Sequence, residues 1–289
     1  MEAAARRDAY VMITPITAFL LVMLALPLLI DLVYSVSHVT FETIRAPSFI
    51  GLGNFLAVMR DDSFWRAMLF SLRFAVLVTI AEVAIGLFLA IFLAPLLSAR
   101  PWLIAVLMLP MMVAPALVGL MYRLILHEFV GVIPYYFYLF TNDSPSFLGP
   151  QNAFYTLVVI ETLQWTPFGL LILYSAYQSV PADMREAAAI DGAGSWGTLL
   201  FVELPWMMPT ILLVIFIRFI DSFRVFDHIY VLTGGGPGNR TTSLSIYIYK
   251  LFFNQNILGE AVAVSIMLLV ASLTLIFAAL RLAVRGRTP

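Results

Sequence analysis

Residues 11–34 read VMITPITAFLLVMLALPLLIDLVY, and Asp31 is their one charged member. A membrane-spanning helix needs about 20 predominantly apolar residues, so this stretch is long enough to cross a bilayer. It exceeds the roughly 7–15 apolar residues of a signal peptide, and no small-residue cleavage site follows it. We therefore predict that it is a retained membrane anchor.

Five further apolar runs have the same character. They cover residues 68–97, 102–126, 154–177, 206–232 and 261–284. Hydrophobic residues make up 62% of the 289-residue chain and charged residues 11%, whereas an average soluble domain has about 25% charged residues. A soluble globule of this size could not hide so much apolar surface. The sequence therefore predicts an all-α membrane protein with six transmembrane helices.

Arginines near the two ends predict the orientation. They are Arg6, Arg7, Arg281, Arg285 and Arg287. Six spans place both termini on one side of the membrane, and cytoplasmic segments are enriched in Lys and Arg. Both termini are therefore expected in the cytoplasm, together with the polar stretch 178–205, while residues 35–67, 127–152 and 233–260 face outward.

The positions of the apolar runs divide the chain into three parts. We expect an N-terminal anchor helix with an external segment over residues 1–67, a core transmembrane domain over 68–284, and a cytoplasmic tail over 285–289.

Several kinds of site are disfavoured by composition and motifs. With 0 Cys there is no disulfide or thiolate ligand, and a net charge of −1 gives no basic field for nucleic acid. The histidines His38, His127 and His228 lack metal-ligand spacing. The glycine-rich run 234–238 lacks the Lys of a phosphate-binding loop and is expected to be a tight turn with positive φ. We find no nucleophile motif, so we expect no catalytic residue, metal or cofactor on this chain.

The fourth predicted span carries polar and aromatic side chains on one helix face. Glu161, Gln164, Trp165 and Phe168 are spaced i, i+3, i+4 and i+7. Pro167 lies inside the same helix and is expected to bend it. Such a face suits a sugar, whose hydroxyls bond polar groups and whose C–H faces contact rings. A buried polar contact with ordinary aromatic packing fits the same pattern.

The fifth predicted span contains charges of alternating sign at i, i+3 intervals, which can pair within the helix. Its polar members are Arg218, Asp221, Ser222, Arg224 and Asp227. Arg218 and Ser222 share a face. A Glu161–Arg218 pair would be either a structural lock between helices or part of a hydrated substrate site, because a charge exposed to lipid is costly. Glu82 in the second span is a further buried charge, whose partner the sequence does not identify.

The cytoplasmic stretch has the pattern of two short helices joined by a sharp corner, which we call the elbow. It reads PADMREAAAIDGAGSW over residues 181–196, followed by FVELP over 201–205. Pro181 suits a first helical turn. Gly192 and Gly194 permit the corner, and Ser195 can cap the second helix.

The elbow resembles the EAA loop of ABC-importer permease subunits. The matching residues are Glu186, Ala187, Ala188, Asp191, Gly192 and Ala193, with Leu204 and Pro205 further on. Two other motifs narrow the resemblance to the carbohydrate-importer branch, as in the first permease of maltose, glycerol-3-phosphate and trehalose importers. They are FIGLGNF at 49–55 and LTGGGPG at 232–238. The resemblance covers residues 11–284 and implies the compact six-span permease fold with a cytoplasmic coupling helix.

The resemblance also implies partners and a mechanism. Glu186, Ala187, Ala188, Asp191 and Gly192 would couple the chain to a separate ATPase. A dimer of ATPase subunits would hold ATP and Mg, and its closure would move two permeases from inward-facing to outward-facing. The second permease is expected to be a different chain, and an extracytoplasmic binding protein would deliver the sugar. The location would be a bacterial or archaeal cytoplasmic membrane.

Substrate contacts can be carried over from the same resemblance. They fall on Glu161, Gln164, Trp165, Phe168, Arg218 and Ser222, where acid and base replace the neutral groups of the maltose permease. We therefore expect half of the passage of an ATP-driven sugar importer. The alternative is a secondary transporter that uses Glu161 and Arg218 in a proton relay, although inverted repeats are not apparent. A membrane enzyme is disfavoured because no catalytic constellation is visible.

Overall fold

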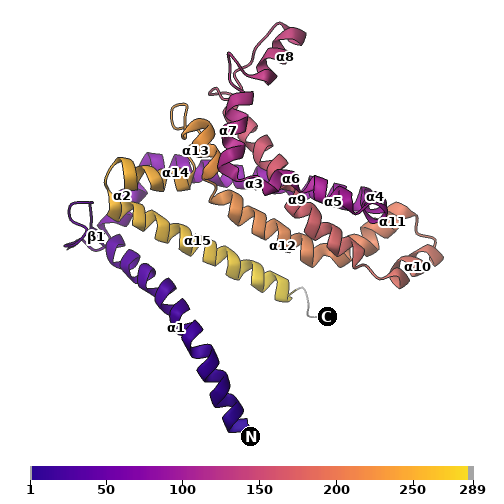
Figure 1. Ribbon diagram of the computed structural model, residues 1–289, viewed down its shortest axis with the longest axis horizontal. Coiled ribbons are helices and arrows are strands. Elements are labelled where there is room, and N and C mark those ends of the chain that lie inside the picture. Colours follow the sequence, from indigo (N-terminus) through magenta and orange to yellow (C-terminus); the bar gives the residue numbers. More distant parts are fainter. Residues whose placement is uncertain (1, 286–289) are drawn as a thin grey trace. The chain divides into compact units, whose positions relative to one another are not determined.

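A computed structural model gives the fold, and it describes the backbone of residues 2–285 and the side chains of residues 12–274, 277 and 281. The chain is mostly helical (Figure 1). The longer helices are α1 (Glu2–Ser35), α3 (Asp62–Phe92), α9 (Ala153–Gln178), α12 (Leu204–Phe223) and α15 (Leu258–Arg285). The shorter ones are α2 (Gly53–Arg60), α4 (Ala94–Ala99), α5 (Trp102–Leu107), α6 (Leu109–Met112), α7 (Pro115–Ile125), α8 (Val132–Thr141), α10 (Ala182–Ile190), α11 (Ser195–Thr198), α13 (Asp227–Thr233) and α14 (Leu244–Tyr249). Two π-helical segments cover Leu199–Glu203 and Lys250–Asn254.

The chain forms two compact units. The first consists of Met1–Phe64 with Tyr247–Thr274, and the second of Trp65–Ile246 with Leu275–Pro289. The three-part division at residues 67 and 284 stays a prediction. Of the arginines used for orientation, Arg281 is described and exposed, whereas the side chains of Arg6, Arg7 and Arg285 and the whole of Arg287 lie outside the described residues, as does most of the tail.

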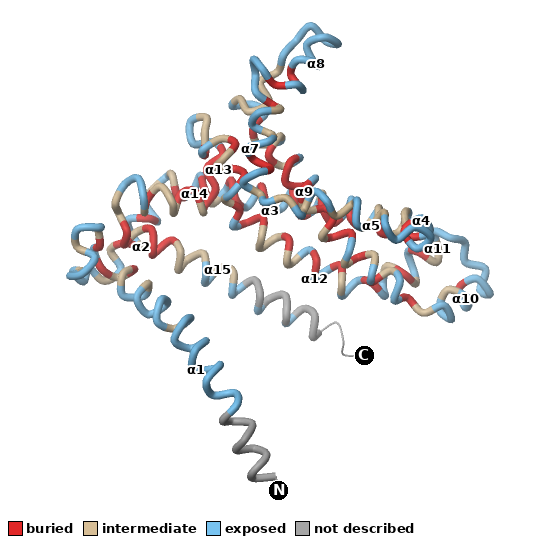
Figure 2. The backbone as a smooth tube through the Cα atoms, in the orientation of Figure 1, coloured by how far each residue is buried: buried red, intermediate tan, exposed pale blue. Residues whose placement is uncertain are grey.

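Four helices among the described residues are long and apolar enough to cross a membrane. They are Met12–Ser35, Asp62–Phe92, Ala153–Gln178 and Ser195–Phe223, and the shorter apolar helices Pro115–Ile125 and Leu258–Thr274 bring the pattern into line with six spans. The fourth span was predicted to within one residue at each end. None of the apolar window of α1 is buried within the chain, so its surface, exposed in Figure 2, needs lipid or another protein to cover it.

The third predicted span is broken, which corrects the expectation of one helix over 102–126. Pro110 and Pro115 occupy the first turns of α6 and α7, because proline lacks the N–H that an uninterrupted helix would require. The carbonyl of Val113 is freed at the second break. It accepts a hydrogen bond from Gln164 Nε2 on α9 at 3.1 Å, so the break is satisfied from a neighbouring helix.

The fifth predicted span is also broken, because α12 ends at Phe223 and α13 starts only at Asp227. Polar side chains satisfy the backbone there. The hydroxyl of Ser243 donates to the Val225 carbonyl at 2.8 Å, and that of Ser245 donates to the Arg224 carbonyl at 2.9 Å. Apolar periodicity did not distinguish one long helix from two helices joined by a hydrogen-bonded break.

The first unit contains a small feature that the all-α prediction did not include. Strands β1 (Ser37–His38) and β2 (Ser48–Phe49) pair antiparallel, with Ser37 opposite Phe49. The buried Asn54 amide donates to the carbonyls of Ser35 and Ser37, each at 2.8 Å.

Another hydrogen bond in the first unit joins α14 to the segment before α3. The Tyr247 hydroxyl donates to Asp61 Oδ2 at 2.6 Å, and burial together with this bond raises the pKa of Tyr247.

The second unit is organised by helices that approach each other closely. Helix α12 packs on α9, and α13 packs on α7 (Figure 1). A Cβ at Gly86 of α3 would lie 3.1 Å from the backbone N of Leu170 on α9, so only glycine permits this crossing without a shift. At Gly119 of α7, a Cβ would lie 3.0 Å from Cα of His228 on α13. These two glycines bring α3, α9, α7 and α13 close enough for side chains to meet in the core.

Candidate functional site

Arg218 of α12 forms a buried ion pair with Glu82 of α3. Its Nε lies 2.6 Å from Glu82 Oε2 and its Nη2 lies 3.1 Å from Oε1, a bidentate arrangement. The Arg218 side chain is 1% exposed and that of Glu82 is 0% exposed. Sequence analysis found no partner for Glu82, and the structure supplies one.

Glu161 and His228 extend the ion pair. Nη2 of Arg218 donates to Glu161 Oε1 at 3.3 Å, and Nε2 of His228 lies 2.5 Å from Glu161 Oε2. Arg218 Nη1 also lies 3.6 Å from Asp221 Oδ2, and Asp221 Oδ1 accepts from Arg224 Nη2 at 2.9 Å, so these charges at i, i+3 pair as the spacing allows. We call Glu82, Glu161, Arg218 and His228 the buried ion network.

Two aromatic rings lie over the network. The guanidinium carbon of Arg218 is 4.8 Å from the centre of the Trp165 ring and 5.9 Å from that of Phe168, within the range of cation–π contacts. Both rings are partly exposed, whereas Glu161 and Gln164 on the same helix are buried. Ser222 is also buried, one turn after Arg218. The predicted site residues of α9 and α12 are thus brought together, with rings accessible and charges covered.

The network joins four helices through paired charges. It connects α3, α9, α12 and α13, and its two carboxylates face one guanidinium and one imidazole. A charge at bilayer depth is costly unless it is paired and hydrogen-bonded, so this pairing lets the four helices keep polar groups in the core. The Glu161–Arg218 pair, which the sequence left open, is present. Within the described residues no three His, Cys, Asp or Glu side chains are placed to hold a metal ion.

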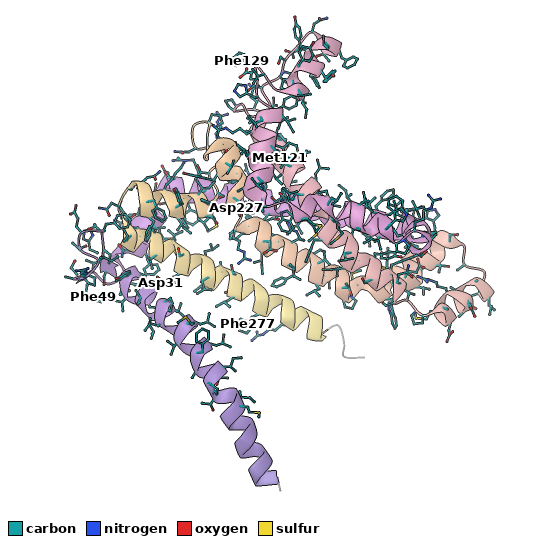
Figure 3. The ribbon with its side chains drawn as sticks, viewed as in Figure 1. Asp31, Phe49, Met121, Phe129, Asp227 and Phe277 are labelled. Carbon is teal, nitrogen blue, oxygen red and sulfur yellow. The ribbon has the colours of Figure 1, made fainter. Side chains whose placement is uncertain are left out.

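The helix α13 that carries His228 begins at Asp227. Figure 3 labels Asp227 there and Met121 on α7, the helix against which α13 packs. Since a Cβ at Gly119 would also lie 3.2 Å from Cβ of His228, the position of the imidazole depends on the small residue on α7.

The elbow has the two short helices that the sequence predicted, α10 and α11. Gly192 adopts φ +79°, which favours glycine, and the Ala193 N–H donates to the Ala188 carbonyl at 2.9 Å to close α10. Pro181 is the N-cap residue of α10 rather than a member of its first turn. Gly194, not Ser195, is the N-cap of α11 and no side chain caps it, so the predicted Ser195 cap is wrong by one position.

The elbow presents its predicted coupling residues outward. Glu186, Ala187, Asp191 and Gly192 are exposed, while Ala188 is buried. Large apolar side chains are exposed beside them. They are Met184, Ile190, Trp196, Leu200 and Phe201. An exposed apolar group next to charged residues is typical of a surface that another protein covers.

Comparisons with known proteins agree with this geometry. Residues 82–287 match the family described as "Binding-protein-dependent transport system inner membrane component". This chain belongs to that family. The match covers the buried ion network and the elbow, so both are parts of a transport-system inner-membrane component and the protein resides in the cell membrane.

Relatives of this inner-membrane component cover nearly its full length. The trehalose/maltose transport system permease protein MalF of Thermococcus litoralis is 32% identical over 93% of this chain and 91% of its own length. The trehalose transport system permease protein SugA of Mycobacterium tuberculosis is 31% identical over 95% of this chain and 88% of its own. Because the relatives are permease proteins, the chain is a transporter subunit and not an enzyme, as predicted.

Solved structures match the fold of the inner-membrane component. A bacterial ABC transporter involved in the import of the acidic polysaccharide alginate contains a chain that is 21% identical, with a TM-score of 0.83 and 99% of both chains covered. The same kind of transporter in complex with an alginate pentasaccharide-bound periplasmic protein matches with a TM-score of 0.80 and 21% identity. This likeness establishes the ABC-importer permease fold.

Sequence reasoning missed two features of the inner-membrane component. His228 was considered only as an isolated histidine without metal-ligand spacing, and its contact with Glu161 links residues far apart in the chain. Arg185 and Glu203 form an ion pair at 2.7 Å at the base of the elbow. The signal was present, since these two opposite charges flank the corner of a short segment.

Proposed function

We propose that this protein forms half of the passage of an ATP-driven importer for a sugar or sugar derivative. The observation that carries the proposal is the exposed elbow between α9 and α12, with Glu186 and the apolar side chains of Ile190 and Trp196 on its surface. A permease driven by another subunit requires helices that line a passage. It also requires an exposed segment, such as the elbow, that joins two of these helices. The names of the relatives support a sugar as the cargo.

The partners follow from the same proposal. The elbow docks on a dimer of ATPase subunits, which hold ATP and Mg. A second permease of different sequence completes the passage, and an extracytoplasmic binding protein delivers the sugar. This arrangement requires the elbow and both termini to lie in the cytoplasm.

The buried ion network and its two rings are the proposed contact region for the cargo. Trp165 and Phe168 are partly exposed and offer ring faces to the C–H groups of a sugar. Glu161, Gln164, Arg218 and Ser222 belong to the same region, and in the described state their burial suits them to fixing the rings. A neutral sugar suits this region, because the guanidinium is already compensated by carboxylates.

Uptake by the complete complex tests the proposal. The permeases, the ATPase and the binding protein are reconstituted in proteoliposomes, and uptake of radiolabelled trehalose or maltose is measured with and without ATP. Uptake that requires ATP and persists with a proton uncoupler supports the proposal. Uptake that needs no ATP and stops with the uncoupler contradicts it and indicates a secondary transporter.

A further inference from the structure

Arg185 joins three elements at the base of the elbow. It projects from α10, and its Nε donates to Glu203 Oε1 at 2.7 Å in the π-helical segment before α12. Its Nη2 donates to the carbonyl of Tyr177 in the last turn of α9 at 3.0 Å. The guanidinium carbon also lies 4.8 Å from the centre of the Tyr177 ring. One side chain thus links the end of α9, the elbow and the start of α12.

The chemistry of this link requires arginine. The planar guanidinium donates to a carboxylate and to a carbonyl at the same time, which the single ammonium of lysine does less well. The Glu203 side chain is 8% exposed and that of Arg185 is 34% exposed, so the carboxylate is the more strongly dependent partner. Glu203 also interacts with the Tyr177 side chain, which closes the group into a three-residue cluster.

The backbone on both sides of the elbow is of a kind that can absorb motion. Residues 179–181 connect α9 to α10 without regular helix, and the corner at Gly192 has positive φ. The π-helical segment Leu199–Glu203 precedes Pro205, and π-helical turns often occur at functional sites. A displacement of the elbow would change the backbone dihedral angles in these segments and leave α9 and α12 in place, unless a side chain fixed the elbow relative to the two helices.

We propose that Arg185 is a positioning residue that fixes the elbow to α9 and α12, so that a displacement of the elbow moves both helices. This inference rests on the proposed function, because it assigns the cluster a role in coupling to the ATPase. Arg185 need not touch the ATPase or the cargo. Its removal should therefore separate ATP hydrolysis from transport rather than prevent docking.

The test measures the amount of sugar imported per ATP hydrolysed by the complete complex in proteoliposomes. Arg185→Gln and Glu203→Met are each expected to lower this ratio at least threefold, with ATPase co-purification unchanged. Arg185→Gln should also lower thermal stability, because it leaves the mostly buried Glu203 carboxylate unpaired. Glu203→Met leaves only the part-exposed Arg185 without its partner, so this variant is expected to keep wild-type stability. The double variant is expected to be no worse than the lower single variant, because both changes remove one shared contact. Arg185→Lys keeps the positive charge but loses the planar guanidinium that donates to both Glu203 and the Tyr177 carbonyl. We expect it to give an intermediate ratio of sugar imported to ATP hydrolysed.

Arg224→Gln is the matched control, since Arg224 is an exposed arginine in an ion pair with Asp221 on α12. Its ratio should equal that of the wild type. An unchanged ratio in Arg185→Gln and Glu203→Met would overturn the inference. The inference would also be overturned if Arg185→Lys lost ATPase association or stability, and if that loss accounted for its whole loss of transport. Failure of the wild-type complex to use ATP would instead refute the proposed function.

Discussion

The guanidinium of Arg218 on α12 lies 2.6 Å from the carboxylate of Glu82 on α3, although 136 positions separate the two residues. Both side chains are buried, and the same guanidinium reaches Glu161 and lies against the Trp165 ring. A single arginine thereby organises the polar part of a hydrophobic bundle. Its contacts connect the stability of the helices with the placement of the rings that are proposed to meet the cargo.

Removal of the arginine should destabilise the bundle strongly. Arg218→Met leaves the carboxylates of Glu82 and Glu161 buried without a cation, and breaking a buried pair in this way costs about 3–5 kcal/mol. We expect a large fall in the thermal unfolding temperature of the detergent-purified protein. Arg224→Met removes an exposed arginine and should change stability by less than about 0.5 kcal/mol. Equal stability of the two variants would contradict the structural role of the buried ion network.

The crossing of α3 and α9 gives a prediction with a matched control. Gly86→Ala places a methyl group 3.1 Å from a backbone nitrogen of α9, so the helices must separate at an expected cost of about 1–3 kcal/mol. Gly169→Ala lies at the same crossing, but its nearest neighbours are 3.7 Å away. Thermal unfolding should show loss of stability for the first variant alone. If both alanines are tolerated equally, the close crossing is wrong.

The aromatic face can be tested on α9 itself. Trp165→Ala removes a partly exposed ring that lies over Arg218, and we expect sugar-stimulated ATP hydrolysis to fall about tenfold, which corresponds to about 1.4 kcal/mol. The complex should still assemble. Leu163→Ala changes an exposed apolar residue of the same helix and should keep wild-type activity. Wild-type stimulation in Trp165→Ala would mean that this ring only packs.

Charge reversal on the elbow should weaken docking. Glu186→Lys changes an exposed carboxylate on α10 to a cation, and we expect less ATPase to co-purify with the permease. Glu128→Lys makes the same charge change at an exposed residue between α7 and α8, where no ATPase contact is expected. Unchanged co-purification and transport for Glu186→Lys would count against the coupling role of this residue.

Local signals predicted several features of the fold well. Helix α9 was located to within one residue, because an apolar run of sufficient length ends at turn-forming residues on both sides. Three glycines of the run 234–238 adopt positive φ, as expected from their lack of a Cβ. Pro110 and Pro115 indicated the breaks in the third span, but the prediction of one helix followed the hydrophobicity of the whole run instead.

The buried ion network was predicted only in part. The shared face of Glu161 and Trp165 follows from helix periodicity, whereas the choice of Glu82 as the partner of Arg218 depends on how α3 crosses α9. That crossing depends on Gly86, whose role becomes visible only when the neighbouring backbone is known. His228 was missed for the same reason, because α13 reaches Glu161 only after the chain breaks at residues 224–226.

The position of the elbow tests the central claim most directly. The chain has 0 Cys, so Ala187→Cys introduces a unique thiol at an exposed residue of α10. A membrane-impermeant maleimide should label it in inside-out vesicles and not in intact cells, and a bifunctional thiol reagent should cross-link it to the ATPase subunit. Tyr136→Cys on α8 should show the opposite sidedness and no such cross-link. Labelling of Ala187→Cys from outside the cell, or a thiol that cross-links to no ATPase in the complete complex, would contradict the account.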